Sequence, residues 1–270
     1  MIALVPARAG SKRIPNKNTR LLAGQPLLVY SIWAAQASGL FDAIIVSTED
    51  ERTGRIAEDA GATWMWRPPA LATGQMPAPD VCWVRYTLDR LREAGRRPES
   101  FALLRPTSPF RDAQTLQRAF GLFTLPDGTH DSLRAVEPVK QHPYKMWTWQ
   151  GDGYPIRPLH VGSHPDGTPW HSSPTQSLPT IYVQNSSLEM AWTANVEAHG
   201  TIHGRKVMPF FTEGYEGFTL DYPEDWDRAE ALIASGAAIL PGPPPSPALA
   251  PAPSDSQSPP APRNPQAANY

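Results

Sequence analysis

The chain has 270 residues, 40% of them hydrophobic and 19% charged, so it is long enough to bury a large core in one or two domains. Its net charge of −2 at pH 7 supplies no broad basic field, and we expect neither nucleic acid nor a membrane as partner. The single cysteine, Cys82, excludes an internal disulfide and a cysteine-based zinc site. Without a bilayer-spanning apolar run or a signal segment before the first strand-like run, we expect a cytoplasmic protein.

Short apolar runs alternate with amphipathic segments through the first half of the chain. Residues that favour helix starts or stops, such as Pro26, Gly61 and Asp112, bound the amphipathic segments. Crossovers of this length indicate a three-layer, Rossmann-like α/β fold: a mostly parallel sheet with helices on both faces and ligands at the carboxyl ends of its strands. The predicted strands are 2–5, 43–47, 63–66, 101–104 and 132–136, and the predicted helices are 26–37, 50–60, 79–94 and 112–123.

The pattern changes at about residues 140–180, where histidine, proline, tryptophan and glycine are dense. We interpret this stretch as an inserted arm. Strand-like runs return at 181–184 and 187–191, and a last helix is expected at about 223–235. Residues 241–270 include eleven prolines and lack a hydrophobic period, so we predict a disordered, proline-rich tail after one domain at 1–240.

A basic loop follows the first predicted strand. Residues 5–18 read VPARAGSKRIPNKN, and the first 20 residues carry five basic side chains and no acidic one. Small residues that allow close backbone approach, with arginine forks and lysine charges, suit a polyanion. The spacing matches neither a P-loop nor a dinucleotide fingerprint. Phosphate binding is therefore the hypothesis, and a solvated basic turn is the alternative.

This loop resembles the PAR-x-x-SK-x-x-P-x-KN signature of the cytidylyltransferases that activate nonulosonic acids, which include the CMP-sialic, legionaminic and pseudaminic acid synthetases. Every fixed position of the signature is present. Three further segments match in the family's order: LRPTSPFR at 104–111, YVQNSS at 182–187 and GFTLDYPEDW at 217–226. The resemblance implies one nucleotide-diphospho-sugar transferase-like domain whose arm makes a homodimer.

The resemblance also implies a reaction. The anomeric hydroxyl of a nonulosonic (sialic-type) acid attacks the α-phosphate of CTP, and pyrophosphate leaves, in the service of cell-surface glycan biosynthesis. Arg8, Lys12 and Lys17 match the family's catalytic basic residues, which neutralise the triphosphate as charge builds on the leaving oxygens. For Arg67 a surface position beside a turn is the alternative. The implied nucleotide contacts are Ala7, Arg8, Ser11, Asn18 and Arg67.

A Mg²⁺ ion, replaceable by Mn²⁺, is implied as cofactor. Asp221 matches the family's metal-binding aspartate, although it also suits the start of the helix that follows. Two positions earlier, where many relatives have a second aspartate, this chain has Thr219, a weaker and neutral ligand. Surface or interface positions are the alternative for each implied sugar contact. Those implied contacts are Arg105, Thr107, Lys145, Gln184 and Asn185.

Two alternatives to this function stay open. A cytidylyltransferase for the related acid Kdo, or another sugar nucleotidyltransferase, would use the same phosphate chemistry. A CTP-binding protein without turnover would fit the threonine at position 219. The residues do not identify the acceptor, because selectivity among similar sugars depends on the shape of the cavity.

Overall fold

The computed structural model describes residues 1–72, 79–126 and 130–244. In these ranges a seven-stranded sheet has the order β11-β7-β10-β6-β1-β4-β5. β10 is antiparallel to both its neighbours, whereas the other neighbouring pairs are parallel, as the long crossovers predict. The strands are β1 (Ile2–Pro6), β4 (Ala43–Thr48), β5 (Thr63–Trp66), β6 (Ser100–Leu103), β7 (Ser132–Pro138), β10 (Tyr182–Trp192) and β11 (Val207–Phe211).

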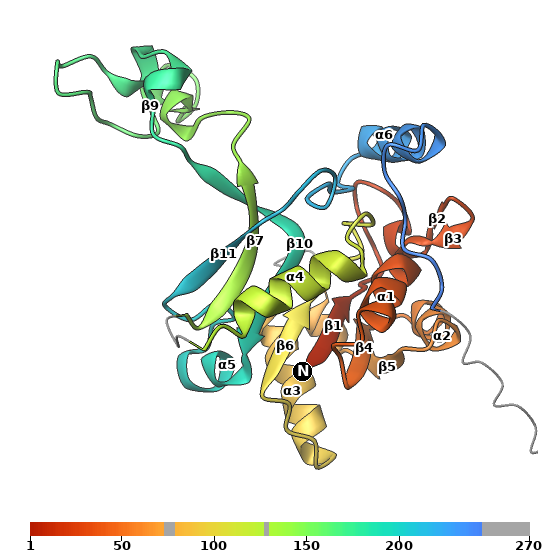
Figure 1. Cartoon of the computed structure of the whole chain (residues 1–270). Helices are drawn as coiled ribbons and strands as arrows, with labels where there is room; N and C mark the ends of the chain where they lie inside the picture. Colours follow the sequence, from red (N-terminus) through yellow and green to blue (C-terminus); the bar gives the residue numbers. More distant parts are fainter. Residues whose placement is uncertain (73–78, 127–129, 245–270) are drawn as a thin grey trace, which may run out of the picture.

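Helices cover both faces of the sheet, which confirms the three-layer α/β fold (Figure 1). α1 (Leu27–Ser38), α2 (Glu51–Asp59) and α4 (Ala113–Phe123) pack on one face. α3 (Asp80–Glu93) and α5 (Thr193–His199) pack on the other. Because successive strand residues point to opposite faces and helices cover both faces, the central strand β1 is buried on both sides and apolar along its length.

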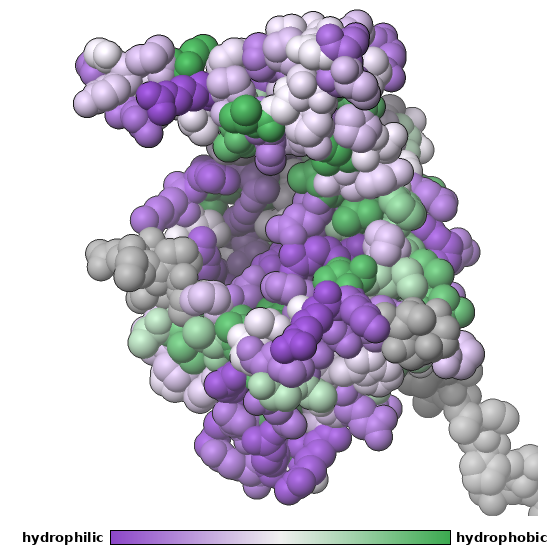
Figure 2. All heavy atoms as spheres, turned by 90° about the vertical axis from the view of Figure 1, so that its left-hand side faces the viewer, coloured by the Kyte–Doolittle hydropathy of each residue, from purple (hydrophilic) through white to green (hydrophobic). Residues whose placement is uncertain are grey.

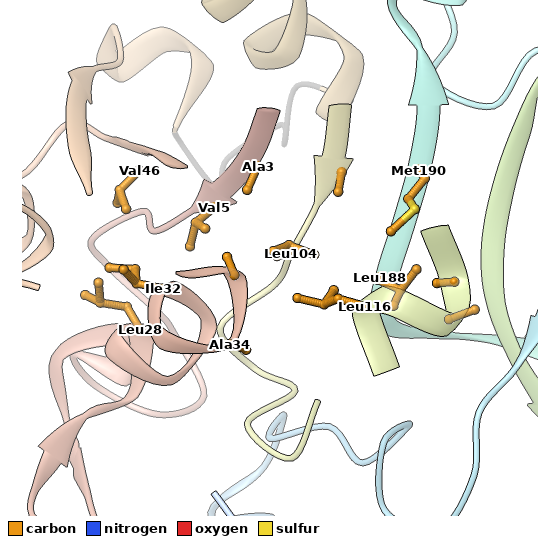
Figure 3. Packing of buried hydrophobic residues seen from close by; sticks show 14 of the residues in the cluster. Ala3, Val5, Leu28, Ile32, Ala34, Val46, Leu104, Leu116, Leu188 and Met190 are labelled. Atoms are coloured by element: carbon orange, nitrogen blue, oxygen red, sulfur yellow. The ribbon is translucent and has the colours of Figure 1, made fainter. Parts of the chain in front are cut away.

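β1 illustrates this alternation. Ala3 and Val5 belong to the cluster under α1, whereas Ile2 and Leu4 belong to the cluster under α3. Figure 3 shows Val5 with Val46 of β4 above Leu28 and Ile32 of α1. The carboxyl end of this buried strand is therefore held rigidly, and the basic loop begins there.

A third hydrophobic cluster joins the two ends of the fold. α6 (Pro223–Ala234) packs on the basic loop and on the small hairpin of β2 (Leu21–Leu22) and β3 (Gln25–Pro26). Ile14 of the loop, Leu220 and Trp226 are almost completely buried in this cluster. Their burial brings the 217–226 segment against the first loop of the chain.

Residues between β7 and β10 form an arm that projects away from the sheet (Figure 1). It contains the short pair β8 (Trp147–Thr148) and β9 (Arg157–Pro158), and the rings of Tyr144 and Trp170 stack with centroids 4.2 Å apart. Its surface carries large exposed apolar side chains: Met146, Trp147, Trp149, Tyr154, Ile156, Leu159 and Val161. The proline-rich tail expected at 241–270 lies outside the described residues from position 245 onward.

Three elements differ from the sequence-based expectation. The strands expected at 181–184 and 187–191 are one strand, β10, with a register shift between Gln184 and Glu189. Polar residues at this irregularity interrupt the hydrophobic alternation. α5 and β11 were not predicted: α5 has only seven residues, and β11 contains Pro209, which an edge strand tolerates. None of the described helices meets the length and apolarity that a membrane crossing requires.

Candidate active site

A cavity of about 490 Å³ opens at the carboxyl ends of β1 and β6. Its walls are the basic loop, the first turn of α3, the turn after β6 and the residue before the cap of α6. Most residues that the sequence singled out line it together: Arg8, Ser11, Lys12, Lys17, Asn18, Arg67, Arg105, Thr107 and Asp221.

The basic loop is held by one hydrogen bond within the loop and by another to Glu49. Asn18 is 8% exposed, and its Nδ2 donates to the carbonyl oxygen of Arg8 over 3.0 Å. The backbone N–H of Ala9 donates to Oε1 of Glu49 over 2.8 Å. The left-handed conformations of Gly10 and Asn16 (φ 75° and 53°) allow the turns of the loop. The loop therefore presents its cations from a fixed backbone.

Lys17 contacts the far end of the sequence. Its Nζ donates to the carbonyl oxygen of Leu220 over 2.7 Å and lies 3.3 Å from Oδ1 of Asp221. The backbone N–H of Leu220 in turn donates to the carbonyl oxygen of Thr107 over 2.9 Å. The basic loop, the turn after β6 and Asp221 thus meet at one place in the cavity.

Two acids near the start of α6, Asp221 and Asp225, have different contacts. Oδ2 of Asp225 accepts from the backbone N–H groups of Asp221 and Tyr222, both over 2.8 Å. The side chain of Asp221 is 45% exposed and lines the cavity. The N-cap residue of α6 is Tyr222, and the acid that bonds to the backbone at the start of this helix is Asp225, at its third position, while the Asp221 carboxylate contacts Lys17.

The donor set at Asp221 fits a Mg²⁺ ion that shares its ligands with a polyphosphate. Mg²⁺ takes one or two carboxylates when phosphate oxygens and water complete its shell. Asp221 offers one carboxylate, and the described residues contain no group of three or more His, Cys, Asp or Glu that would form an all-protein site. The hydroxyl of Thr219 donates to the carbonyl oxygen of Gly217 over 3.3 Å, and Thr219 does not line the cavity.

Arg67 is buried at the base of the cavity, not exposed beside a turn. It is 3% exposed, its Nη2 lies 3.4 Å from Oε2 of Glu49, and its guanidinium lies 5.7 Å from the ring centroid of Trp83. Burial lowers the pKa of Arg67, although Glu49 opposes this effect, and a guanidinium stays charged at neutral pH. The surface alternative for Arg67 is therefore wrong.

Arg105 is held by two carboxylates that the sequence analysis missed. Its Nη2 lies 2.6 Å from Oδ2 of Asp80 and 3.2 Å from Oε1 of Glu189. Burial alone would raise the pKa of Asp80, but Arg105 and a 2.8 Å hydrogen bond from Trp83 Nε1 hold it below its ordinary value. Arg134 also contacts Glu189, at 2.5 Å.

These paired charges extend from the cavity across β6, β10 and β7. The hollow beneath the arm in Figure 2 has mostly hydrophilic residues along its sides and floor. Sequence reasoning interpreted Asp80 as part of an amphipathic helix and Glu189 as part of a strand. Both elements are present, but only the tertiary contact with Arg105 shows what these acids do.

Arg111, in the turn-to-helix segment after β6, is a second group that the sequence analysis did not assign. It is 1% exposed, and burial lowers its pKa to about 9, which keeps it cationic at neutral pH. Its guanidinium donates to Oγ of Ser31 over 2.7 Å and to the carbonyl oxygens of Ser187 and Arg105. Arg111 thereby anchors the turn that carries Arg105 and Thr107.

Four of the expected contacts do not line this cavity. Ala7 is fully buried, and its backbone N–H donates to the carbonyl oxygen of Ser47 over 3.0 Å. Lys145 lies in the arm. Gln184 accepts a hydrogen bond from Arg134, and Asn185 donates to Glu137 and Thr212. The three of these four that were expected to contact the sugar therefore lie in the arm or on the neighbouring part of β10.

The chain is similar in sequence to known cytidylyltransferases. The family model described as cytidylyltransferase matches residues 2–82. The chain is 29% identical over 242 residues to the CMP-N,N'-diacetyllegionaminic acid synthase of Legionella pneumophila, which covers 86% of this chain and 96% of that protein. It is 30% identical over 258 residues to a 3-deoxy-manno-octulosonate cytidylyltransferase of an Anaeromyxobacter species, with coverage of 86% and 96%.

A higher identity is confined to part of the chain. The N-acylneuraminate cytidylyltransferase of Escherichia coli is 43% identical over 123 residues, which are 46% of this chain and 28% of that protein. Among solved structures, a CMP:2-keto-3-deoxy-manno-octonic acid synthetase with CTP superposes with a TM-score of 0.57 at 12% identity, over 87% of this chain and 98% of that one. At this identity the likeness shows the fold.

A Rossmann-like fold with a cation-lined cavity, together with these relatives, identifies the protein as a nucleotidyltransferase. Within that class, the full-length relatives and the family match show that the chain belongs to the cytidylyltransferase family.

Proposed function

We propose that this cytidylyltransferase transfers CMP from CTP to the anomeric hydroxyl of a nonulosonic acid and releases pyrophosphate. One observation carries the proposal: the basic loop and Asp221 face the same cavity, with Nζ of Lys17 3.3 Å from the Asp221 carboxylate. A triphosphate needs concentrated positive charge, and its bridging cation needs a carboxylate beside that charge.

The proposed catalytic residues act by positioning and charge. Arg8, Lys12 and Lys17 line the cavity and would bind the β- and γ-phosphates, so that the charge that grows on departing pyrophosphate is stabilised. Ser11, Asn18 and Arg67 would contact the nucleotide. The side chain of Asn18 supports the loop through the Arg8 carbonyl, which favours a role in loop shape as much as in direct contact.

We propose that Asp221 holds Mg²⁺, or Mn²⁺ in its place, together with the phosphate oxygens. Such an ion supplies charge neutralisation at the α-phosphate and the leaving group. With threonine at 219, this segment offers one acidic ligand instead of two, so we expect a stronger requirement for free metal ion than in relatives with two aspartates.

For the acceptor we propose a nonulosonic acid over Kdo. The relative from Legionella supports a legionaminic acid derivative, and the local match to N-acylneuraminate cytidylyltransferases includes the same class of acid. The full-length Anaeromyxobacter relative keeps Kdo as the second candidate. Arg105 and Thr107 line the cavity, but Arg105 is already paired with Asp80 and Glu189, so a sugar carboxylate there would compete with two protein acids.

We propose that the protein works as a cytoplasmic homodimer joined through the arm. The exposed aromatic and aliphatic side chains of the arm support this, because apolar patches of that kind mark protein interfaces. Lys145 would then reach the cavity of the other subunit, and Gln184 and Asn185, at the base of the arm, would border it.

Pyrophosphate release tests the function directly. Purified protein is assayed with CTP, UTP, GTP or ATP against sialic, legionaminic and pseudaminic acids and Kdo, with Mg²⁺ or Mn²⁺. We expect release with CTP and at least one nonulosonic acid. Release with Kdo alone would select the second candidate. CTP binding without release for any acceptor would instead identify a nucleotide-binding protein.

A further inference from the structure

Arg13 lines the cavity and occupies a variable position of the loop signature. The proposed function gives it no role. We propose that Arg13 is an additional phosphate-binding residue, held over the cavity by Tyr222, and that it binds the terminal phosphates of the nucleotide. This inference rests on the proposed function and extends it to the side chain that holds the leaving group.

Contacts hold Arg13 both at its backbone and at its guanidinium. Its neighbour Ile14 is 1% exposed in the cluster with Leu220 and Trp226, which anchors the backbone. The guanidinium lies over the ring of Tyr222, 4.6 Å from the centroid. An arginine stacked by its face keeps the N–H donors at its edge free for an anion, and its prior ordering reduces the entropy lost on binding.

Arg13 also differs in charge balance from three of the other cations that line the cavity. Lys17 pairs with Asp221, Arg67 pairs with Glu49, and Arg105 pairs with two acids. Within ranges 1–72, 79–126 and 130–244, Arg13 forms no ion pair. A guanidinium that no carboxylate neutralises, on the wall of a cavity, is a strong site for a phosphate oxygen.

Contacts among the lining residues indicate which part of the nucleotide Arg13 meets. One group joins Asp80, Trp83 and Arg105 on the α3 side. The other joins Arg13 through Tyr222 to the segment of Asp221, which Lys17 contacts. Because the phosphates belong beside Asp221 and its cation, Arg13 lies at the phosphate end and, in our proposal, binds the two phosphates that leave as pyrophosphate.

The residues just after the basic loop contain a matched control. Arg20 stacks on the ring of Trp226 at 4.3 Å, so it also connects this part of the chain to α6, yet it does not line the cavity. If the arginine–aromatic pair only fastened the loop to the helix, removing either arginine would have the same effect.

The test is the binding of CTP and CMP to the full-length protein by titration calorimetry in the presence of Mg²⁺, without acceptor. Arg13→Met keeps the aliphatic stem and removes the charge. We expect it to weaken CTP binding at least about tenfold, since a charged hydrogen bond is lost, and to leave CMP binding within about twofold. We expect Arg20→Met to leave both affinities unchanged.

The holding role of Tyr222 is tested in the same assay. Tyr222→Leu removes the ring and should weaken CTP binding more than CMP binding, and Tyr222→Phe, which restores the ring, should recover most of that loss. The inference is overturned if Arg13→Met binds CTP like the wild type, if it loses CTP and CMP equally, or if Arg20→Met shows the same selective loss. A wild-type protein that binds no CTP would overturn the proposed function together with this inference.

Discussion

Asp221 and Asp225 show how side chains four residues apart take different tasks. Asp225 is turned to the backbone N–H groups at the start of α6, where a carboxylate offsets the positive end of the helix. Asp221, one residue outside the cap, is turned to Lys17 and the cavity. The chemistry of each acid follows from which donors surround it, not from its residue type.

Replacing Asp221 with Asn should lower turnover by about 10²–10³-fold, because a charge that stabilises the transition state is lost while the shape is kept. The measurement is pyrophosphate release at saturating CTP and acceptor, with thermal unfolding as a check on the fold. Asp227→Asn, on the exposed side of α6, is the control and should keep wild-type turnover. A fully active Asp221→Asn protein would remove Asp221 from the metal site.

Replacing Arg105 with Gln should change the choice of acceptor while leaving the KM for CTP nearly unaltered. The change removes the cation that neutralises Asp80 and Glu189, so the acceptor side of the cavity becomes more acidic. The measurement is the ratio of kcat/KM between acceptors. Arg134→Gln also takes a partner from Glu189 but lies outside the cavity, and it should alter that ratio less. Equal ratios in all three proteins would contradict a specificity role.

At the scale of elements, an ion pair fastens α4 to the loop that leads toward Asp221. Arg118 of α4 contacts both carboxylate oxygens of Glu216, at 2.7 and 3.0 Å, and Thr115 donates to the same group over 2.7 Å. Burial alone would raise the pKa of Glu216, but Arg118, the backbone N–H of Glu213 and Thr115 lower it overall. The ionised form is therefore stabilised by folding.

Glu216→Gln should lower the free energy of unfolding by about 1–2 kcal/mol at pH 7, because a charge-assisted hydrogen bond is weakened. The pKa in the folded state lies below the ordinary value of 4.5, so this contribution is complete above about pH 4.5. It declines as the pH falls through the folded pKa, and the two proteins should converge in acid.

Urea denaturation at several pH values measures this difference. Glu213→Gln is the matched control, because Glu213 also faces Arg118 but at 3.7 Å and with 78% of its side chain exposed. We expect it to change the free energy of unfolding by less than about 0.5 kcal/mol. A difference between wild type and Glu216→Gln that grew in acid would contradict the assigned sign.

The sequence predicted most elements because burial pattern and local propensity agree in them. β4 and α1 are apolar on the sides that packing covers, and their predicted bounds lie within a residue or two of the observed ones. β11 and α5 were missed because an edge strand with an internal proline and a helix of two turns carry little periodic signal. Their stability comes from tertiary contacts.

At the scale of the whole molecule, the arm exposes the largest share of aromatic surface among the described residues. Trp149 and Tyr154 are 61% and 60% exposed although both are large aromatic residues. Stable interfaces bury about 1,200–2,000 Å² in total, much of it from aromatic side chains at the centre of the contact. The proposed homodimer would cover these rings.

Replacing Trp149 and Tyr154 together with Ser should shift the protein from dimer to monomer in sedimentation velocity, because the apolar area of the interface is lost. Turnover should fall while CTP affinity is preserved, since the phosphate cavity lies within one chain. Leu21→Ser, at a 58% exposed residue outside the arm, should leave the protein dimeric. A wild-type protein that sediments as a monomer would contradict the homodimer.

By itself, the sequence determined the class of fold and the basic loop, because periodicity and residue chemistry are local properties, whereas the candidate acid at position 221 came from the resemblance to a family. Only the tertiary structure decided that Lys17 contacts Asp221 across 204 positions of the chain, that Asp80 and Glu189 pair with Arg105, and that the guanidinium of Arg13 lies over the ring of Tyr222. These pairings depend on how the third hydrophobic cluster packs α6 against the first loop. Packing of that kind depends on many weak contacts between residues that are distant in the sequence. It therefore cannot be predicted from any short stretch of sequence.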